Sequence, residues 1–136
     1  MDTSYDTDVV AWANEQAALL RAGKLDAIDV LNIAEEIEDV GRSQLHAVES
    51  LLTQAIRHML KAEAWPLSRD APTWRADAID FRQQATRRFT PSMRQKVDVP
   101  RLYQQALRAM PETIDGQAPL PVPDTCPVTL DELLED

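Results

Sequence analysis

An apolar stripe with helical spacing runs through residues 29–64 and constrains the fold of this chain more than any other feature. Its members recur with the period of one face of an α-helix. They are Val30, Ile33, Ile37, Val40, Val48, Leu51, Leu52, Ala55 and Met59. The run ends at Trp65, because the residue before Pro66 avoids helical dihedral angles. The spacing therefore predicts one long helix from about residue 29 to residue 64.

A helix of this length is too long to be enclosed by a small domain. At 1.5 Å per residue it would extend about 54 Å, whereas a compact chain of this size has a radius of gyration of about 14 Å. Gly41 is the expected position of a kink, since glycine inside a helix costs about 1 kcal/mol relative to alanine. The stripe nevertheless keeps its phase across Gly41, which favours a continuous helix in contact with a second copy of the chain.

Shorter helical patterns flank the long one. Capping and breaking residues delimit helices at about 7–22, 74–89 and 99–110. Residues 116–127 form a proline-rich, extended connector, and Thr129 with Glu132 forms a capping box before a short final helix. The sequence predicts an all-α fold in which residues 1–136 form a single helical domain built on the long helix.

Composition and charge narrow the class of protein. Cys126 is the only cysteine, which excludes an internal disulfide and suits a reducing compartment. No secretory signal and no apolar run of about 20 residues is present, so we expect a cytoplasmic protein without a membrane span. Residues 1–56 hold 11 acids and 3 bases, residues 57–108 hold 5 acids and 11 bases, and residues 109–136 hold 7 acids and no base. Such blocks can pair within one chain or between two copies.

Three stretches resemble a known family. They are YDTDVVAWANEQAALLRAG, LDAIDVLNIAEEIEDVGRS and TCPVTLDELLED, and together they extend over nearly the whole chain. In this order they resemble the bacterial family called domain of unknown function twenty-nine. The resemblance implies a small all-helical cytoplasmic protein and transfers no catalytic residue.

The phrase IAEEIEDVGRS places a charged face on the long helix. The residues of this possible interaction surface are Glu35, Glu38, Asp39, Arg42, His46 and Glu49. Carboxylate and imidazole groups are common metal ligands, so a metal-binding protein or enzyme using Glu35–Glu49 is one alternative. The Glu-x-x-His pairs of helical di-iron sites are absent, however. Arg42 can form ion pairs with Glu38 and Asp39, as expected if this face of the helix is simply exposed to solvent. We therefore predict no metal, cofactor or catalytic residue.

Two further groups of residues are candidate contacts. The expected interface on the apolar stripe of the long helix comprises Val48, Leu52, Ala55 and His58. A possible basic patch, with arginines for phosphate and aromatic side chains nearby for stacking, comprises Arg75, Arg82, Arg87 and Arg88. Asp77 and Asp80 interrupt this patch and the chain is acidic overall, so the competing interpretation is that its arginines pair with the chain's own acidic segments.

These observations favour a protein–protein interaction module over an enzyme. We expect the chain to form a homodimer or to dock on a protein partner through the long helix and its charged flanks. The alternatives are the metal protein or enzyme described above and a nucleic-acid binder that uses the arginine-rich helix 74–89.

Overall fold

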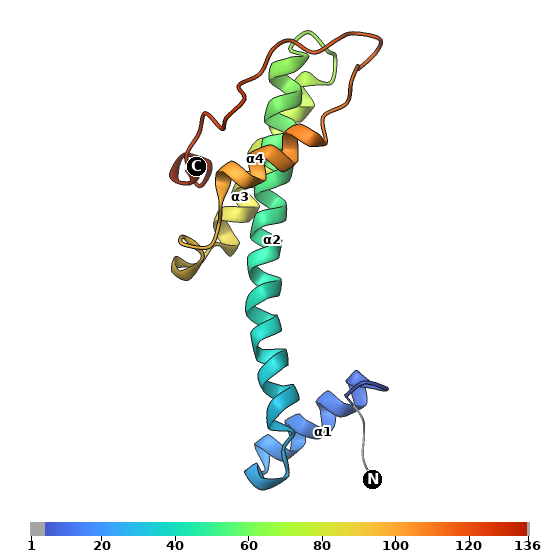
Figure 1. The fold of residues 1–136 in the computed structure, drawn as a ribbon, viewed down its shortest axis with the longest axis vertical. Coiled ribbons are helices and arrows are strands. Elements are labelled where there is room, and N and C mark those ends of the chain that lie inside the picture. The colour runs from blue at the N-terminus through green and yellow to red at the C-terminus, as the bar shows by residue number, and fades with distance from the viewer. Residues whose placement is uncertain (1–4, 136) are drawn as a thin grey trace. The chain divides into compact units, whose positions relative to one another are not determined.

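The fold is all-α, as the sequence predicts. The computed structural model describes residues 5–135, and within this range it contains helices and connecting segments but no β-strand (Figure 1). The α-helices are α1 (Val9–Arg21), α2 (Val30–Ala64), α3 (Ala71–Arg88), α4 (Val99–Arg108) and α5 (Leu130–Leu133). Two 3₁₀ turns, η1 (Leu25–Ala27) and η2 (Pro91–Met93), lie in the connections.

Helix α2 runs without interruption through Gly41 and confirms the predicted long helix. It begins at Val30, one residue after Asp29, whose carboxylate accepts the backbone N–H of Asn32 at 3.3 Å. It ends at Ala64, directly before Trp65 and Pro66. At 1.5 Å per residue its 35 residues extend about 52 Å.

The chain divides between Ser43 and Gln44 into two compact units. We call the described residues 5–43 unit 1 and residues 44–135 unit 2. Unit 1 contains α1, η1 and the first part of α2, and unit 2 contains the rest of α2 together with α3, η2, α4 and α5. The single domain expected over residues 1–136 stays a prediction.

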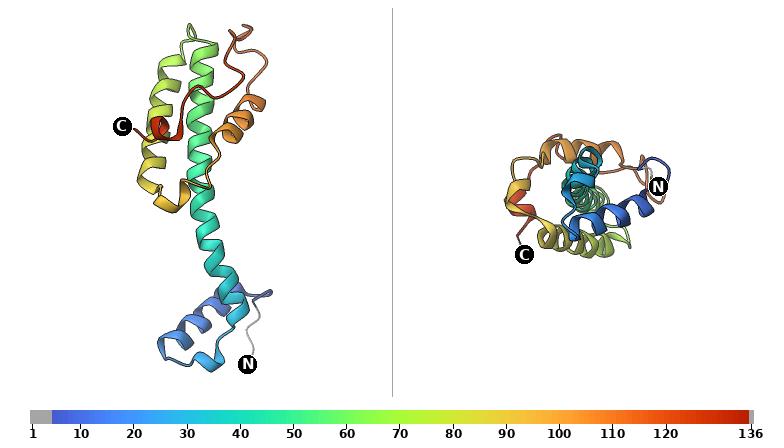
Figure 2. Two further views of the ribbon diagram at one scale, coloured as in Figure 1. Left: turned by 60° about the vertical axis from the view of Figure 1, so that its left-hand side comes forward. Right: turned by 90° about the horizontal axis from the view of Figure 1, so that it is seen from below.

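The core of unit 2 forms where α3, α4 and the C-terminal segment pack on the second part of α2 (Figure 2). Its largest fully buried side chains are Tyr103, Leu52, Ile56, Leu60, Leu102, Leu133 and Val48. A second cluster of Ala62, Ala64, Trp65, Ala71 and Trp74 closes the end of α2 against the start of α3. The first cluster uses the apolar stripe of α2 through Val48 and Leu52, whereas the second uses residues that follow the last member of the stripe, Met59.

The interface expected on α2 is not on the surface. Val48, Leu52 and Ala55 are each 0% exposed. They are core residues of unit 2, because α3, α4 and α5 fold back over this part of the helix. The prediction that these three residues contact a second copy is therefore wrong.

Most helix ends follow from their sequence. Asp98 caps α4 and accepts the N–H of Arg101 at 3.2 Å, and the capping box of Thr129 and Glu132 starts α5 as predicted. Helix α3 begins at Ala71, earlier than the expected residue 74, because Pro72 is accepted in the first turn of a helix.

The segment after α4 returns along unit 2 and is fixed by side-chain bonds to its backbone. Asp115 and Gly116, both with positive φ, form a tight turn closed by paired bonds between Ile114 and Gln117. Trp65 Nε1 donates to the Gln117 carbonyl at 2.8 Å, and Tyr103 OH donates to the Pro123 carbonyl at 2.5 Å. The proline-rich connector is thus held in place although it has few backbone hydrogen bonds of its own.

Arg82 anchors the end of the chain on α3. Its guanidinium donates to the carbonyl oxygens of Leu133 at 2.9 Å, Glu132 at 2.8 Å and Glu135 at 3.1 Å. These carbonyls lie in and just after α5, where the last carbonyl groups of a helix lack helical partners. Helix α5 is only four residues long and has little stability of its own. The bonds from Arg82 therefore help to keep Leu133 in the core.

We expect the substitution Arg82→Ala to lower the free energy of unfolding by about 1–2 kcal/mol, since it removes hydrogen bonds from a charged donor. Urea denaturation followed by tryptophan fluorescence measures this change. The matched control is Arg87→Ala, an exposed arginine of the same helix that makes no ion pair within residues 5–135. Equal stabilities of the two variants would show that Arg82 does not anchor the C-terminal helix.

Candidate functional site

Asp29 organises the polar interior of unit 1. Its carboxylate accepts Trp12 Nε1 at 3.0 Å and Asn32 Nδ2 at 2.7 Å, and its backbone N–H donates to Gln16 Oε1 at 2.7 Å. The bonds from Asn32 and from Trp12 hold the pKa of the Asp29 carboxyl below its usual value. Trp12 and Gln16 are buried, and the ring of Tyr5 lies edge-on to Trp12 with centroids 4.8 Å apart. Helix α1 is therefore joined to the start of α2 by a few specific contacts.

A second link joins the segment before α1 to α2. Tyr5 OH donates to Glu36 Oε1 at 2.6 Å. This hydrogen bond, with smaller contributions from burial and from the negative charge of Glu36, raises the pKa of Tyr5 to about 12. The bond occupies Glu36, the one acid of the IAEEIEDVGRS phrase that lies apart from the others around the helix.

The substitution Glu36→Gln is expected to lower the pKa of Tyr5 toward the value near 10 of a free tyrosine. Ionised Tyr5 would then no longer face a carboxylate, so its charged form would be less disfavoured. The ultraviolet absorbance of tyrosinate measures the titration, and circular dichroism recorded in parallel shows that the protein is still folded. Glu35→Gln is the comparison variant, because Glu35 bonds to Arg42 and adds only the smallest contribution to the raised pKa of Tyr5, so this variant should lower that pKa less than Glu36→Gln does. Identical titrations of wild type and Glu36→Gln would contradict the assignment.

Unit 1 carries an apolar surface that the described chain leaves uncovered. Its members are large apolar side chains exposed by 44–84%, namely Val9, Val10, Leu20, Leu25, Val30, Leu31, Ile37 and Val40. We call these eight residues the unit 1 apolar surface. Unit 2, which is more than twice as long, has three such side chains, Leu67, Ile79 and Leu120. The helical period revealed the stripe, but it could not show which part of it stays exposed.

Arg42 gathers the acids of the predicted interaction surface that lie in unit 1. Its Nη2 lies 3.2 Å from Glu35 Oε1, its Nη1 lies 3.9 Å from Glu38 Oε2, and its Nε and Nη2 both donate to Asp39 Oδ1. The bond to Asp39 is the largest cause of the raised pKa of Arg42. All four side chains are about half exposed, so this is a solvated ion-pair cluster on α2.

His46 and Glu49, the other two residues of the predicted interaction surface, belong to unit 2. They line a polar groove of about 560 Å³ between α2 and α4, together with Arg57 and Arg101. Glu49 Oε2 lies 2.6 Å from Arg101 Nη2, and the Glu49 side chain is only 14% exposed. Arg101 is 52 positions away in sequence, so no local pattern indicated this ion pair. The six predicted residues are therefore divided between the two units.

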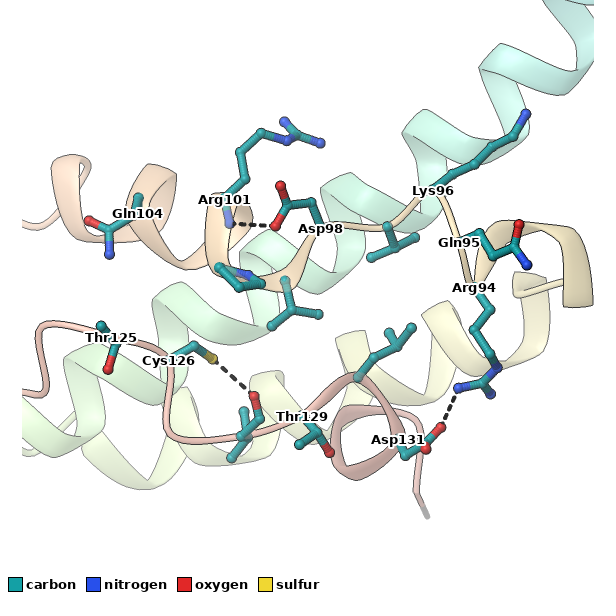
Figure 3. Close-up of a pocket in the computed structure, with 15 residues that line it drawn as sticks. Arg94, Gln95, Lys96, Asp98, Arg101, Gln104, Thr125, Cys126, Thr129 and Asp131 are labelled. Carbon is teal, nitrogen blue, oxygen red and sulfur yellow. Dashed lines mark hydrogen bonds and ion pairs between the residues drawn. The ribbon is translucent and has the colours of Figure 1, made fainter.

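A groove of about 1040 Å³ lies between the start of α4 and the C-terminal segment (Figure 3). Arg94 forms an ion pair with Asp131 at 2.5 Å across one end of it. Cys126 is half-buried and donates its thiol to the Val128 carbonyl at 3.3 Å. Lys96 also lines the groove, and the Arg94–Asp131 ion pair joins the C-terminal segment to the turn before α4.

The arginines of the possible basic patch do not form one surface. Arg82 is engaged by the C-terminal carbonyls. Arg75 and Arg82 line a shallow, largely apolar groove beside Ile79, whereas Arg87 and Arg88 are exposed in the last turn of α3. This dispersal gives no support to a nucleic-acid interface on α3.

His58 is a packed side chain of unit 2. Its Nδ1 lies 2.8 Å from the Gln54 carbonyl, and its ring lies against Phe81 with centroids 5.3 Å apart. Its Nε2 is 3.9 Å from Asp77 Oδ2. His58 therefore packs between α2 and α3 within unit 2, where the sequence suggested a contact with another chain.

Among residues 5–135, no three His, Cys, Asp or Glu side chains converge as metal ligands would. Within the same range, no helix is long and apolar enough to cross a membrane.

Comparison with known proteins agrees with the all-α architecture. Residues 4–136 match the family described as Domain of unknown function DUF29. The chain is also similar to an α-helical protein of unknown function from Rhodospirillum rubrum ATCC 11170, with 28% sequence identity and a TM-score of 0.68. That alignment covers 100% of this chain and 92% of the other. No curated protein matches the chain.

Proposed function

We propose that this chain, which belongs to the DUF29 family, is a protein–protein interaction module. Its binding surface lies on unit 1. The observation that carries this proposal is the unit 1 apolar surface. Residues 5–43 expose eight large apolar side chains and bury one hydrophobic side chain, Trp12. A small unit that is stable by itself buries more large apolar side chains than it exposes, because burial of apolar area is the main favourable term in folding. Unit 1 does the opposite.

Single exposed apolar residues are ordinary, but a concentration of them in one short segment is not. Burying one Val, Leu or Ile side chain is favourable by about 1.5–3 kcal/mol. The free energy available from covering the unit 1 apolar surface is therefore comparable with the stability of a typical domain. A partner that covers these side chains gains that free energy, which supports binding as the role of unit 1.

The charges of unit 1 add selectivity to this surface. Residues 5–43 hold nine acids and three bases, a net charge of −6. Glu35, Glu38 and Asp39 surround Arg42 on the exposed side of α2. Charges at the rim of an interface mainly steer encounter and reject like-charged partners.

The proposal is tested by asking whether the unit 1 apolar surface is accessible or covered in purified, untagged protein. Sedimentation velocity measures the mass, and the neutral dye Nile red reports exposed apolar surface without being repelled by the acidic charge. We expect either an assembly larger than the monomer or a monomer that binds the dye. Ile37→Gln should lower the mass of the assembly in the first case and the dye binding in the second. Leu67→Gln, at a 98% exposed position of unit 2, should change neither.

A monomer that binds no dye would contradict the proposal. It would show that the chain covers its own apolar side chains in solution and needs no partner for unit 1.

A further inference from the structure

We infer that the partner of unit 1 is a second copy of this chain, held through a seam on α2 formed by Val30, Ile33, Ile37 and Val40. This inference rests on the proposed function and identifies its partner. The seam belongs to the part of α2 that precedes the core of unit 2. Val30, Ile37 and Val40 are exposed by 62–67%, and Ile33 is half-buried.

The spacing of the seam is that of a helix–helix interface. Its residues are separated by three, four and three positions, which is the alternation of the a and d positions of a heptad. At 100° per residue they fall within a sector of about 80° on α2. Such a stripe is narrower than the apolar face by which a helix packs into a globular core, and it is typical of helices that pair along their length.

The side chains of the seam indicate more than two helices in the assembly. All four are β-branched, and Ile or Val at both a and d disfavours two-stranded coiled coils. Each copy of unit 1 contributes α1 as well as the first part of α2. Two copies therefore supply four helices, the number that forms the simplest closed helical bundle.

Charge placement permits two acidic copies to approach through this seam. Glu35, Glu38, Asp39 and Arg42 lie on the side of α2 opposite the seam, at about 80–180° when Val30 is set at zero. Ala34 and Gly41 are small and lie at one edge of the seam, where they allow close approach of another helix. Glu36 lies at the other edge, and its carboxylate is bonded to Tyr5. Like charges would therefore not be forced together in the interface.

The available apolar area is what a stable dimer requires. At about 100 Å² for each side chain, the unit 1 apolar surface without Leu31, which lies at about 100° on the charged side of α2, offers about 700 Å² per copy, close to the roughly 800 Å² of a standard protein interface. The seam supplies roughly half of this area, and α1 carries further exposed side chains such as Val9 and Leu20. The next heptad position after Val40 is Gln44, which is polar and exposed. The seam thus ends where the core of unit 2 begins to use the stripe.

The decisive experiment compares two matched double variants of the full chain by sedimentation velocity over a range of concentrations. The seam variant is Ile37→Gln with Val40→Gln, and the control is Leu67→Gln with Ile79→Gln, at exposed positions of unit 2. We expect wild type and control to sediment at about 31 kDa, twice the chain mass of 15.3 kDa. The seam variant should raise the dimer dissociation constant by about 100-fold or more, because four apolar contacts are lost per dimer.

Circular dichroism shows whether the variants keep their helices, and the single variants Ile37→Gln and Val40→Gln provide milder changes if the double variant loses helicity. If the seam variants leave the dimer unchanged, the seam is not the dimer interface. If the wild type is a monomer, the partner of unit 1 is not a second copy of the chain. If that monomer binds Nile red, the interaction function stands with a different partner, and if it does not, the proposed function fails as well.

Discussion

Replacing Trp12 with alanine is expected to open unit 1 while leaving unit 2 folded. Trp12 is 4% exposed and is the one hydrophobic side chain that residues 5–43 bury. Its indole also donates to Asp29 and contacts the ring of Tyr5. Truncating a buried tryptophan to alanine costs about 3–5 kcal/mol, and unit 1 has few other buried contacts to offset this loss. Helix α1 should then separate from α2.

Hydrogen exchange resolved by segment measures this effect. We expect the amides of α1 to exchange at least about 100-fold faster in Trp12→Ala, as about 3 kcal/mol implies, and the amides of α3 and α4 to change little. Trp12→Phe keeps most of the burial and loses the N–H donor, so it should cost about 1 kcal/mol. Val10→Ala, at an exposed position of the same helix, is the control. Unchanged exchange in α1 would show that Trp12 does not hold this unit together.

The substitution Leu52→Ala is expected to lower the free energy of unfolding of unit 2 by about 2–5 kcal/mol. Leu52 is 0% exposed and lies in a core with Ile56, Leu102 and Leu133. Removing its side chain loses transfer free energy and leaves a cavity that helices from three parts of the chain would have to close. Denaturation followed by the fluorescence of Trp65 and Trp74 reports on this unit.

Leu67→Ala is the matched control, because Leu67 is an almost fully exposed leucine of unit 2 and its truncation should change stability by less than about 0.5 kcal/mol. The pair also separates a core role for Leu52 from an interface role. If Leu52→Ala changes the mass of the assembly but leaves the unfolding free energy of unit 2 unaltered, the assignment of Leu52 to the core is wrong.

Features encoded over a few residues could be predicted from the sequence. The bounds of α2 follow from its apolar period and from Trp65-Pro66, and the starts of α4 and α5 follow from Asp98 and from the capping box of Thr129. The ion pairs of Arg42 with Glu38 and Asp39 were also predictable, because pairs three and four residues apart on a helix are set by helical geometry alone.

Contacts between distant residues could not be predicted in this way. Arg101 meets Glu49 across 52 positions, and Arg82 reaches carbonyls about 50 positions further along the chain. Both arginines belonged to a basic segment whose local composition also fits nucleic-acid binding. The pairing of Arg82 depends on the path of the proline-rich connector, which has no periodic pattern.

The sequence by itself determined that this protein is all-α and built on one long helix, because hydrogen bonding and side-chain period within a helix are local. It also determined that an apolar stripe runs along that helix with constant phase. Only the tertiary structure decided how the stripe is used. Val48 and Val30 lie at the same angle around α2, yet Val48 is buried and Val30 is exposed. The difference arises because residues 66–135 fold back over the second part of the helix, and that return is a matter of long-range packing that helical periodicity does not encode.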